Sequence, residues 1–125
     1  MSELIFSKVL TANDVGETLS HQAGIHIPKS MPELLSFLPE LGQDVFNPSV
    51  WIKCRDEYDE IWTFRYVYYN NKFYSPNGRR NEYRLTHMTK FLKYNSSVAG
   101  DSFVITKREK DYEYRIRVVP QTTNP

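Results

Sequence analysis

The stretch from Ile61 to Tyr69 constrains the fold of this chain more than any other part of the sequence. It is dense in aromatic and β-branched side chains and contains neither glycine nor proline. This composition is typical of a strand in a partly buried sheet. Shorter patterns of the same kind occur at residues 4–10, 24–28, 49–54, 82–86, 103–106 and 112–119. The sequence therefore predicts a mainly β fold with about seven short strands.

Two short helices are expected between these strands. Ser30 and Glu33 have the spacing of a capping box, and the leucines that follow predict a helix over residues 31–38. A second helix is expected over residues 86–94, where the apolar residues recur at helical spacing. Strands and helices in these numbers predict a closed or nearly closed barrel with the helices at its ends.

The length of 125 residues fits one domain, expected over residues 1–119 and followed by a tail at 120–125. Cys54 is the sole cysteine and lies in an apolar strand, which excludes a disulfide framework and a multi-cysteine zinc site. No apolar run reaches the roughly 20 residues of a membrane-spanning helix. The amino terminus has no secretory signal pattern. We expect a soluble domain of a reducing compartment.

Motifs of catalysis are missing from the sequence. No acidic residue is followed two positions later by lysine, as in many metal-dependent nucleases, and no His-x-Lys motif occurs. His21 and His26 flank a glycine and lack the spacing of a helical metal site. The five glycines are scattered, so no phosphate-binding loop is predicted. We expect that the chain alone is not an enzyme and holds neither metal nor cofactor.

Charge is divided unevenly along the chain, although the formal net charge is only +1. Residues 33–60 contain seven acidic and two basic side chains, whereas residues 65–93 contain seven basic side chains and a single acid, Glu82. Binding of a polyanion depends on the local potential rather than on the sum of charges. The division fits a nucleic-acid-binding surface, and equally two solvated faces of an ordinary protein.

The segment from Arg79 to Arg84 combines the side chains that read base edges. Arginine can take the O6 and N7 atoms of guanine, asparagine pairs with adenine, and glutamate accepts from the amino group of cytosine. A loop that only gripped phosphate would not need Glu82. Arg80, Glu82 and Arg84 alternate, so a strand would turn them to one side. The alternative interpretation is an exposed strand with weak arginine–glutamate ion pairs.

A second candidate surface combines Lys8 with the loop that follows the first predicted strand. This loop supplies short polar groups and little charge, namely Asn13, Thr18, Ser20, His21, Gln22 and His26. Such groups suit contacts to base edges and phosphates in a fixed geometry. The alternative is an ordinary polar surface loop.

Five segments of the chain resemble, in the same order, the amino-terminal effector domain of EcoRII-type restriction endonucleases. They are residues 10–16 (LTANDVG), 21–28 (HQAGIHIP), 47–50 (NPSV), 68–70 (YYN), and 80–82 (RNE) followed by Arg84. Gly100, Asp101 and Phe103 are similar to the plant B-three DNA-binding domains, which share the same pseudobarrel. The resemblance implies a mainly β, seven-stranded open pseudobarrel with two short helices.

The resemblance also implies that the domain binds double-stranded DNA as a monomer, with two arms in the major groove and a short GC-rich target such as CCWGG. The first arm would contain Lys8, His21 and His26, and the second Arg65, Arg80, Glu82 and Arg84. Together with the residues chosen from their chemistry, the predicted DNA-binding set is Lys8, Asn13, Ser20, His21, Gln22, His26, Arg65, Arg79, Arg80, Asn81, Glu82, Tyr83 and Arg84.

A nuclease domain is expected to follow Pro125 in the parent protein, a type II restriction enzyme of the bacterial cytoplasm. Mg²⁺ is expected only for that separate domain. Two other functions remain open from the sequence. The acidic stretch 33–60 would suit a barrel that docks a basic protein partner. The tyrosines 66, 68, 69 and 74 would suit stacking on single-stranded nucleic acid.

Overall fold

The computed structural model describes residues 3–16, 24–28, 36, 38–42, 45–70, 82–108, 111 and 113–121. Its strands are β1 (Glu3–Val9), β2 (Ile25–Ile27), β3 (Ser49–Arg55), β4 (Ile61–Tyr69), β5 (Glu82–Thr86), β6 (Ser102–Arg108) and β7 (Tyr114–Val119), and its helix is α3 (Thr89–Tyr94). All seven predicted strands are confirmed, with ends that differ by no more than two residues. The helix predicted over residues 31–38 falls almost entirely outside the described residues.

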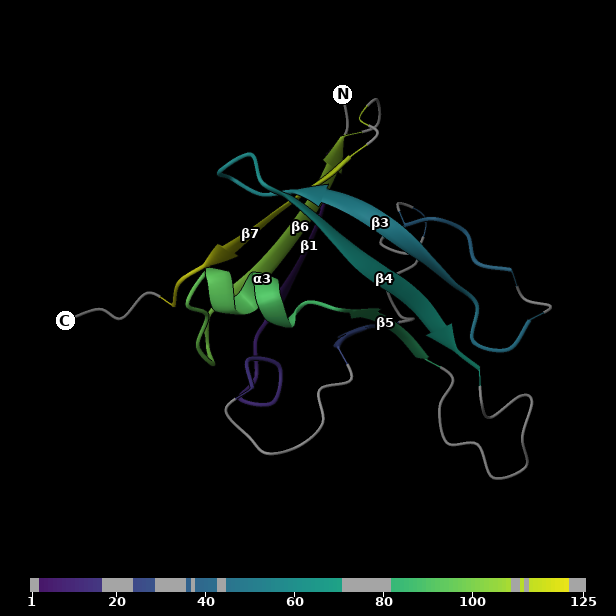
Figure 1. Cartoon of the computed structure of the whole chain (residues 1–125), viewed down its shortest axis with the longest axis horizontal. Helices are drawn as coiled ribbons and strands as arrows, with labels where there is room; N and C mark the ends of the chain where they lie inside the picture. Colours follow the sequence, from purple (N-terminus) through teal and green to yellow (C-terminus); the bar gives the residue numbers. More distant parts are fainter. Residues whose placement is uncertain are drawn as a thin grey trace.

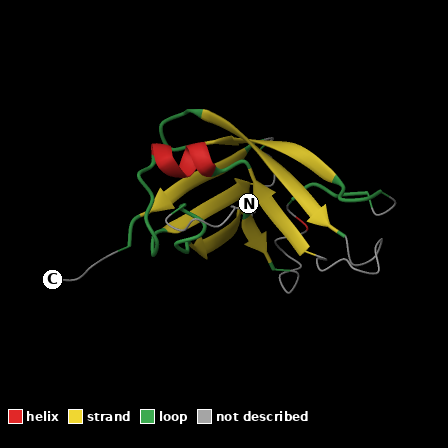
Figure 2. Cartoon of the chain, turned by 60° about the horizontal axis from the view of Figure 1, so that its bottom comes forward, coloured by secondary structure: helices red, strands yellow, loops and turns green. Residues whose placement is uncertain are grey.

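The strands form one sheet in the order β1-β6-β7-β3-β4-β5-β2. The β3–β7 pair is parallel and the other five pairs are antiparallel. Figures 1 and 2 show the sheet bending round into a half-barrel. Among the described residues no ladder joins β1 to β2, so the open pseudobarrel is confirmed and full closure is not. None of the described helical segments has the length and apolar character that crossing a membrane requires.

The inner side of the sheet carries the core. In β7 the side chains alternate strictly, with Tyr114, Ile116 and Val118 buried and the arginines between them exposed. This period of two is what makes a strand amphipathic. The ring of Phe91 on α3 packs edge-on against Phe64 at 5.7 Å and thereby fastens the helix to the sheet.

Helix α3 begins at Thr89, three residues later than predicted. His87 has a φ of 65°, in the left-handed region, and this residue cannot belong to a right-handed helix. Met88 is the N-cap, and it makes no side-chain capping bond. The sequence pattern located the buried residues Met88, Phe91 and Leu92 correctly but not the break before them.

Buried polar side chains fix the connections of the sheet. Asp56 is 2% exposed, and its carboxylate accepts from the backbone N–H groups of Tyr58 (2.8 Å) and Glu60 (2.9 Å) and from Trp62 Nε1 (2.9 Å). This acid of the acidic stretch is therefore committed to the β3–β4 turn rather than to a docking face. At the other end of β4, Asn70 Oδ1 accepts from the Asn47 N–H at 2.8 Å.

The burial of Cys54 can be tested through the pH dependence of the unfolding free energy. Burial, with a smaller contribution from the Glu113 carboxylate, raises the pKa of the thiol from 9.0 to about 12. The unfolded chain loses this proton first, so the unfolding free energy is undiminished below pH 9.0 and falls as the pH rises toward 12. The loss amounts to about 1.4 kcal/mol per pH unit for one such group.

We expect Cys54→Ala to lower the unfolding free energy at neutral pH, because it leaves a small cavity. The same variant should lose stability less steeply above about pH 9, by up to about 1.4 kcal/mol per pH unit. Urea unfolding at a series of pH values measures both effects. Parallel pH curves for the two proteins would contradict the prediction.

Candidate nucleic-acid interface

Strand register gathers several predicted DNA-binding residues on the outer side of the sheet. His26 of β2 lies opposite Arg84 of β5, and Arg84 lies opposite Val67 of β4. In the next row of this side, Arg65 of β4 lies between Thr86 of β5 and Trp51 of β3. Cross-strand partners point to the same side of a sheet. We call the part of this side that carries His26, Trp51, Arg65, Glu82 and Arg84 the polar face.

Arg84 is held rigidly on the polar face. Its Nε donates to Glu82 Oε1 at 3.1 Å, and its Nη2 reaches Glu82 Oε2 at 3.5 Å. Its Nη1 donates to the backbone carbonyl of Gly24 at 2.8 Å. Side-on bonds of a carboxylate to a guanidinium fix the plane of the arginine fork. The Gly24 carbonyl, just before β2, fixes it from the other side, so the fork is oriented before any ligand arrives.

His26 completes this group at the sheet edge. Its side chain is 45% exposed, and its Nε2 lies 3.7 Å from Glu82 Oε2. This distance is too long for a hydrogen bond, but it lets a protonated imidazole attract the carboxylate. His26, Glu82 and Arg84 come from the two arms that the sequence predicted, and the structure brings these three together.

Tyr83 does not lie with its neighbours in sequence. Strand alternation turns it to the inner side, where its ring stacks on Tyr66 at 5.7 Å and contacts Tyr68 at 4.4 Å. Tyr66 is 1% exposed, and burial raises the pKa of its hydroxyl. The structure thus separates Tyr83 from the polar face. The same packing removes Tyr66 from any stacking platform for single-stranded nucleic acid.

Lys8 has a partner within the protein, and its predicted DNA contact stays a prediction. Its Nζ pairs with Asp14 Oδ2 at 2.7 Å, and the Asp14 side chain is 6% exposed. The same carboxylate oxygen accepts from the Thr11 N–H at 3.0 Å, so Asp14 shapes the turn after β1. Lys8 therefore supports the beginning of the first predicted arm, with its charge neutralised by Asp14.

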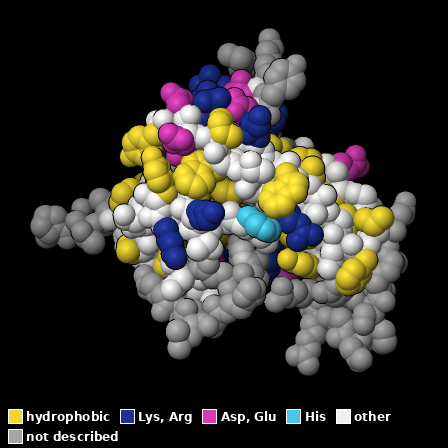
Figure 3. All heavy atoms as spheres, viewed as in Figure 1, with side chains coloured by type: hydrophobic (Ala, Val, Ile, Leu, Met, Phe, Trp, Pro, Cys, Tyr) yellow, Lys and Arg dark blue, Asp and Glu magenta, His cyan; other side chains and the backbone are white. Residues whose placement is uncertain are grey.

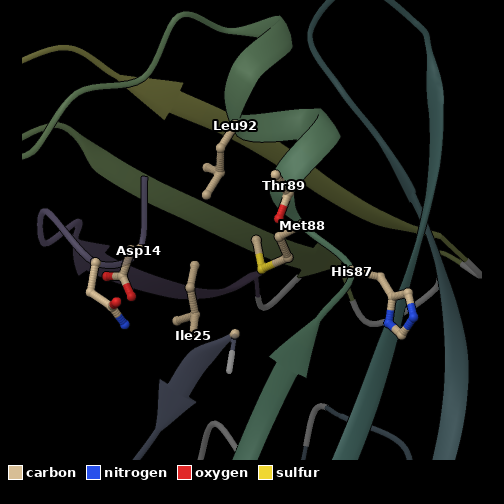
Figure 4. A pocket seen from close by; sticks show the side chains of 8 residues that line it. Asp14, Ile25, His87, Met88, Thr89 and Leu92 are labelled. Atoms are coloured by element: carbon tan, nitrogen blue, oxygen red, sulfur yellow. The ribbon is translucent and has the colours of Figure 1, made fainter. Parts of the chain in front are cut away.

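Asn13 lies in the turn that Asp14 shapes, at the rim of a small pocket of about 40 Å³. The pocket brings this turn next to Gly24 and Ile25 of the β2 region and to His87 and Met88 after β5 (Figure 4). The structure thus joins the first loop to the end of the polar face. The other predicted DNA-binding residues, Ser20, His21, Gln22, Arg79, Arg80 and Asn81, lie outside the described residues.

Sequence reasoning missed three residues that shape the polar face. Gly24 has a φ of 88°, and a Cβ at this position would collide with the Leu85 carbonyl oxygen. Its glycine identity was the available signal, because only glycine fits such a close approach. Trp51 and His87, whose rings are in contact, gave no signal beyond their residue types.

A family model described as "Restriction endonuclease EcoRII, N-terminal" matches residues 1–118. The chain belongs to this family. Among curated relatives of this EcoRII N-terminal domain is the type II restriction enzyme EcoRII of Escherichia coli, 33% identical over 90 residues that cover 66% of the chain and 20% of the enzyme. Auxin response factor 5 of Oryza sativa subsp. japonica is 29% identical over 106 residues, which cover 84% of the chain and 8% of that protein. The chain spans only a small part of either relative.

Solved structures confirm the fold of this EcoRII N-terminal domain. The structure titled "Arabidopsis FUS3-DNA complex" matches with a TM-score of 0.68 and 24% identity, covering 94% of the chain and 97% of the other. A hypothetical Arabidopsis thaliana protein matches with a TM-score of 0.58 and 14% identity, covering 98% and 96%. The expected likeness to the plant pseudobarrel is therefore confirmed at the level of fold.

Proposed function

We propose that this domain recognises a short GC-rich site in double-stranded DNA, of the CCWGG type, through the major groove and as a monomer. Membership of the EcoRII N-terminal family supports a role in restriction. The observation that carries the proposal is the oriented Arg84–Glu82 pair on the polar face. The predicted DNA-binding residues Ser20, His21, Gln22, Arg79, Arg80 and Asn81 extend this proposed interface, and so do Lys8, Asn13 and Arg65.

The hydrogen bonds of Arg84 define what it can still bind. A guanidinium has five N–H donors. Glu82 and Gly24 engage one donor on each of the three nitrogens, which leaves one N–H on each terminal nitrogen. Two donors on neighbouring nitrogens match the O6 and N7 acceptors of guanine. Because the fork is already oriented, binding costs little side-chain entropy.

Glu82 complements Arg84, because it selects for a hydrogen-bond donor on the base whereas Arg84 selects for acceptors. Its carboxylate accepts from Arg84, and a carboxylate is also the acceptor that the N4 amino group of a cytosine requires. If a base presents an acceptor instead of a donor at this position, the negative charge of Glu82 repels it. Arginine and glutamate together therefore suit a G·C pair, and neither side chain alone has this discrimination.

We further propose that the domain, over residues 1–119, is the recognition part of a longer site-specific deoxyribonuclease of the bacterial cytoplasm. The support is that the chain covers 20% of the EcoRII enzyme. Residues 120–125 would lead to the remainder of that protein. Cleavage and its Mg²⁺ requirement would belong to that remainder.

Equilibrium binding at one fixed salt concentration tests the proposed function. The probes are a CCWGG duplex, a scrambled duplex of equal length and composition, and the single strands of each. We expect about 1,000-fold tighter binding of the cognate duplex than of the scrambled duplex, with a one-to-one complex by sedimentation. Equal affinities for the two duplexes would refute sequence recognition. Tighter binding of the single strands would favour the stacking function instead.

A further inference from the structure

Trp51 and His87 form an exposed ring pair on the polar face, beside Arg65. The ring centroids are 4.9 Å apart in an edge-to-face arrangement, and Trp51 is 57% exposed. Trp51 and Arg65 are cross-strand neighbours. On the face drawn in Figure 3, a histidine side chain lies at the surface among hydrophobic and basic side chains. An indole, an imidazole and a guanidinium are thus adjacent on a continuous sheet surface.

The backbone at His87 is held in an unfavourable conformation. Its φ of 65° lies in the left-handed region, where glycine is at ease and most other residues are strained. The Thr86 hydroxyl lies 2.9 Å from His87 Nδ1 and fixes the orientation of the ring. Figure 4 shows the His87 side chain turned away from the small pocket and toward the β3–β4 strands. The fold tolerates the strain and presents an oriented imidazole beside Trp51.

Trp51 and His87 extend the polar face beyond Arg84, but their side chains cannot distinguish one base pair from another. Trp51 and Arg65 lie one row along the sheet from Arg84, on the same side. An indole face cannot tell one base pair from another. A single imidazole N–H cannot do so either, but it is a good donor to a phosphate oxygen. When the Thr86 hydroxyl donates to Nδ1 at 2.9 Å rather than to the Arg65 carbonyl at 3.5 Å, the proton of His87 is on Nε2 and is available as that donor.

We propose that Trp51, His87 and Arg65 bind the sugar–phosphate backbone of the duplex next to the bases that Arg84 reads. This inference rests on the proposed function. Trp51 packs on a deoxyribose, and His87 Nε2 and the Arg65 guanidinium donate to phosphate oxygens. These contacts set the position of the duplex on the polar face and contribute equally to binding of any sequence.

The test compares Trp51→Ala and His87→Asn with a matched control. Tyr58→Ala removes another aromatic ring that is 63% exposed and also in an edge-to-face pair, with Tyr94, on the β3–β4 turn. Each of the two test variants should weaken binding of cognate and scrambled duplexes by the same factor, about tenfold. Tyr58→Ala should bind both duplexes like the unaltered domain. Arg65→Ala should in addition reduce the salt dependence by about one phosphate contact.

A second variant of His87 separates binding from folding. His87→Gly relieves the left-handed backbone, so its unfolding temperature should be unchanged or higher while its affinity for both duplexes falls about tenfold. A lower unfolding temperature would overturn the inference, because the ring would then be structural.

The outcomes distinguish this inference from the proposed function. If the unaltered domain prefers the cognate duplex, but Trp51→Ala and His87→Asn bind like the control, the backbone contact is refuted and sequence recognition stands. A loss confined to the cognate duplex also overturns the backbone assignment, because it indicates base reading. Absence of duplex binding by the unaltered domain refutes the proposed function itself.

Discussion

Arg84→Ala is expected to weaken binding of the cognate duplex by about 1–3 kcal/mol and to relax the sequence preference at one base pair. Glu82 and the Gly24 carbonyl orient the fork of Arg84, and two of its N–H donors remain. Alanine removes both of the N–H groups that would donate to the O6 and N7 atoms of guanine. Binding of the scrambled duplex should change much less, since only one positive charge is lost. Titration of both duplexes at one salt concentration measures the two effects.

Two further variants control this prediction. Arg84→Lys keeps the charge but not the planar fork, so it should bind the scrambled duplex like the unaltered domain and still lack the preference for the cognate one. Arg117→Ala removes an exposed arginine of β7, outside the polar face, and should leave the ratio of the two affinities unchanged. A preference that survives both Arg84→Ala and Arg84→Lys would contradict the assigned role.

Glu82→Gln should move the two affinities in opposite directions. The cognate duplex should bind about 1–3 kcal/mol more weakly, because the amide holds Arg84 less firmly and accepts less well from cytosine. The scrambled duplex should bind more tightly, because one negative charge near the phosphates is gone. The side chain keeps its size, so the unfolding temperature should change little.

The opposite signs make the Glu82 prediction selective. If Glu82 only balanced the charge of Arg84 on an exposed strand, glutamine would strengthen binding of both duplexes. If the side chain only supported the fold, both affinities would fall together with the unfolding temperature. The salt dependence of each complex, measured in parallel, reports whether the number of phosphate contacts has stayed the same.

The strands could be predicted from the sequence because their side chains alternate between core and solvent. In β7 the buried residues follow this period strictly, and a local pattern is enough to locate them. In β4, Phe64 and Tyr66 follow it, but Val67 next to Tyr66 is buried as well. The alternation also placed Glu82 and Arg84 on one side of β5. The same alternation turns Tyr83 to the other side, which the predicted DNA-binding set did not take into account.

The rest of the candidate site depends on contacts between distant segments. The bond from Arg84 to the Gly24 carbonyl spans 60 positions of the chain, and the pairing of β2 with β5 that permits it has no local signature. The pair of Lys8 with Asp14, which supports the first turn, was likewise not predicted. The left-handed backbone at His87 delays α3, although the apolar spacing alone predicts an earlier start.

A double-mutant cycle between protein and DNA tests the central claim most directly. Each guanine of the CCWGG duplex is replaced in turn by 7-deazaguanine, which lacks the N7 acceptor, and every duplex is titrated with the unaltered domain and with Arg84→Ala. If Arg84 reads a guanine, the two changes are coupled by at least about 1 kcal/mol at one position and are additive at the others. Additivity at every guanine would contradict the claim that the polar face reads bases through Arg84.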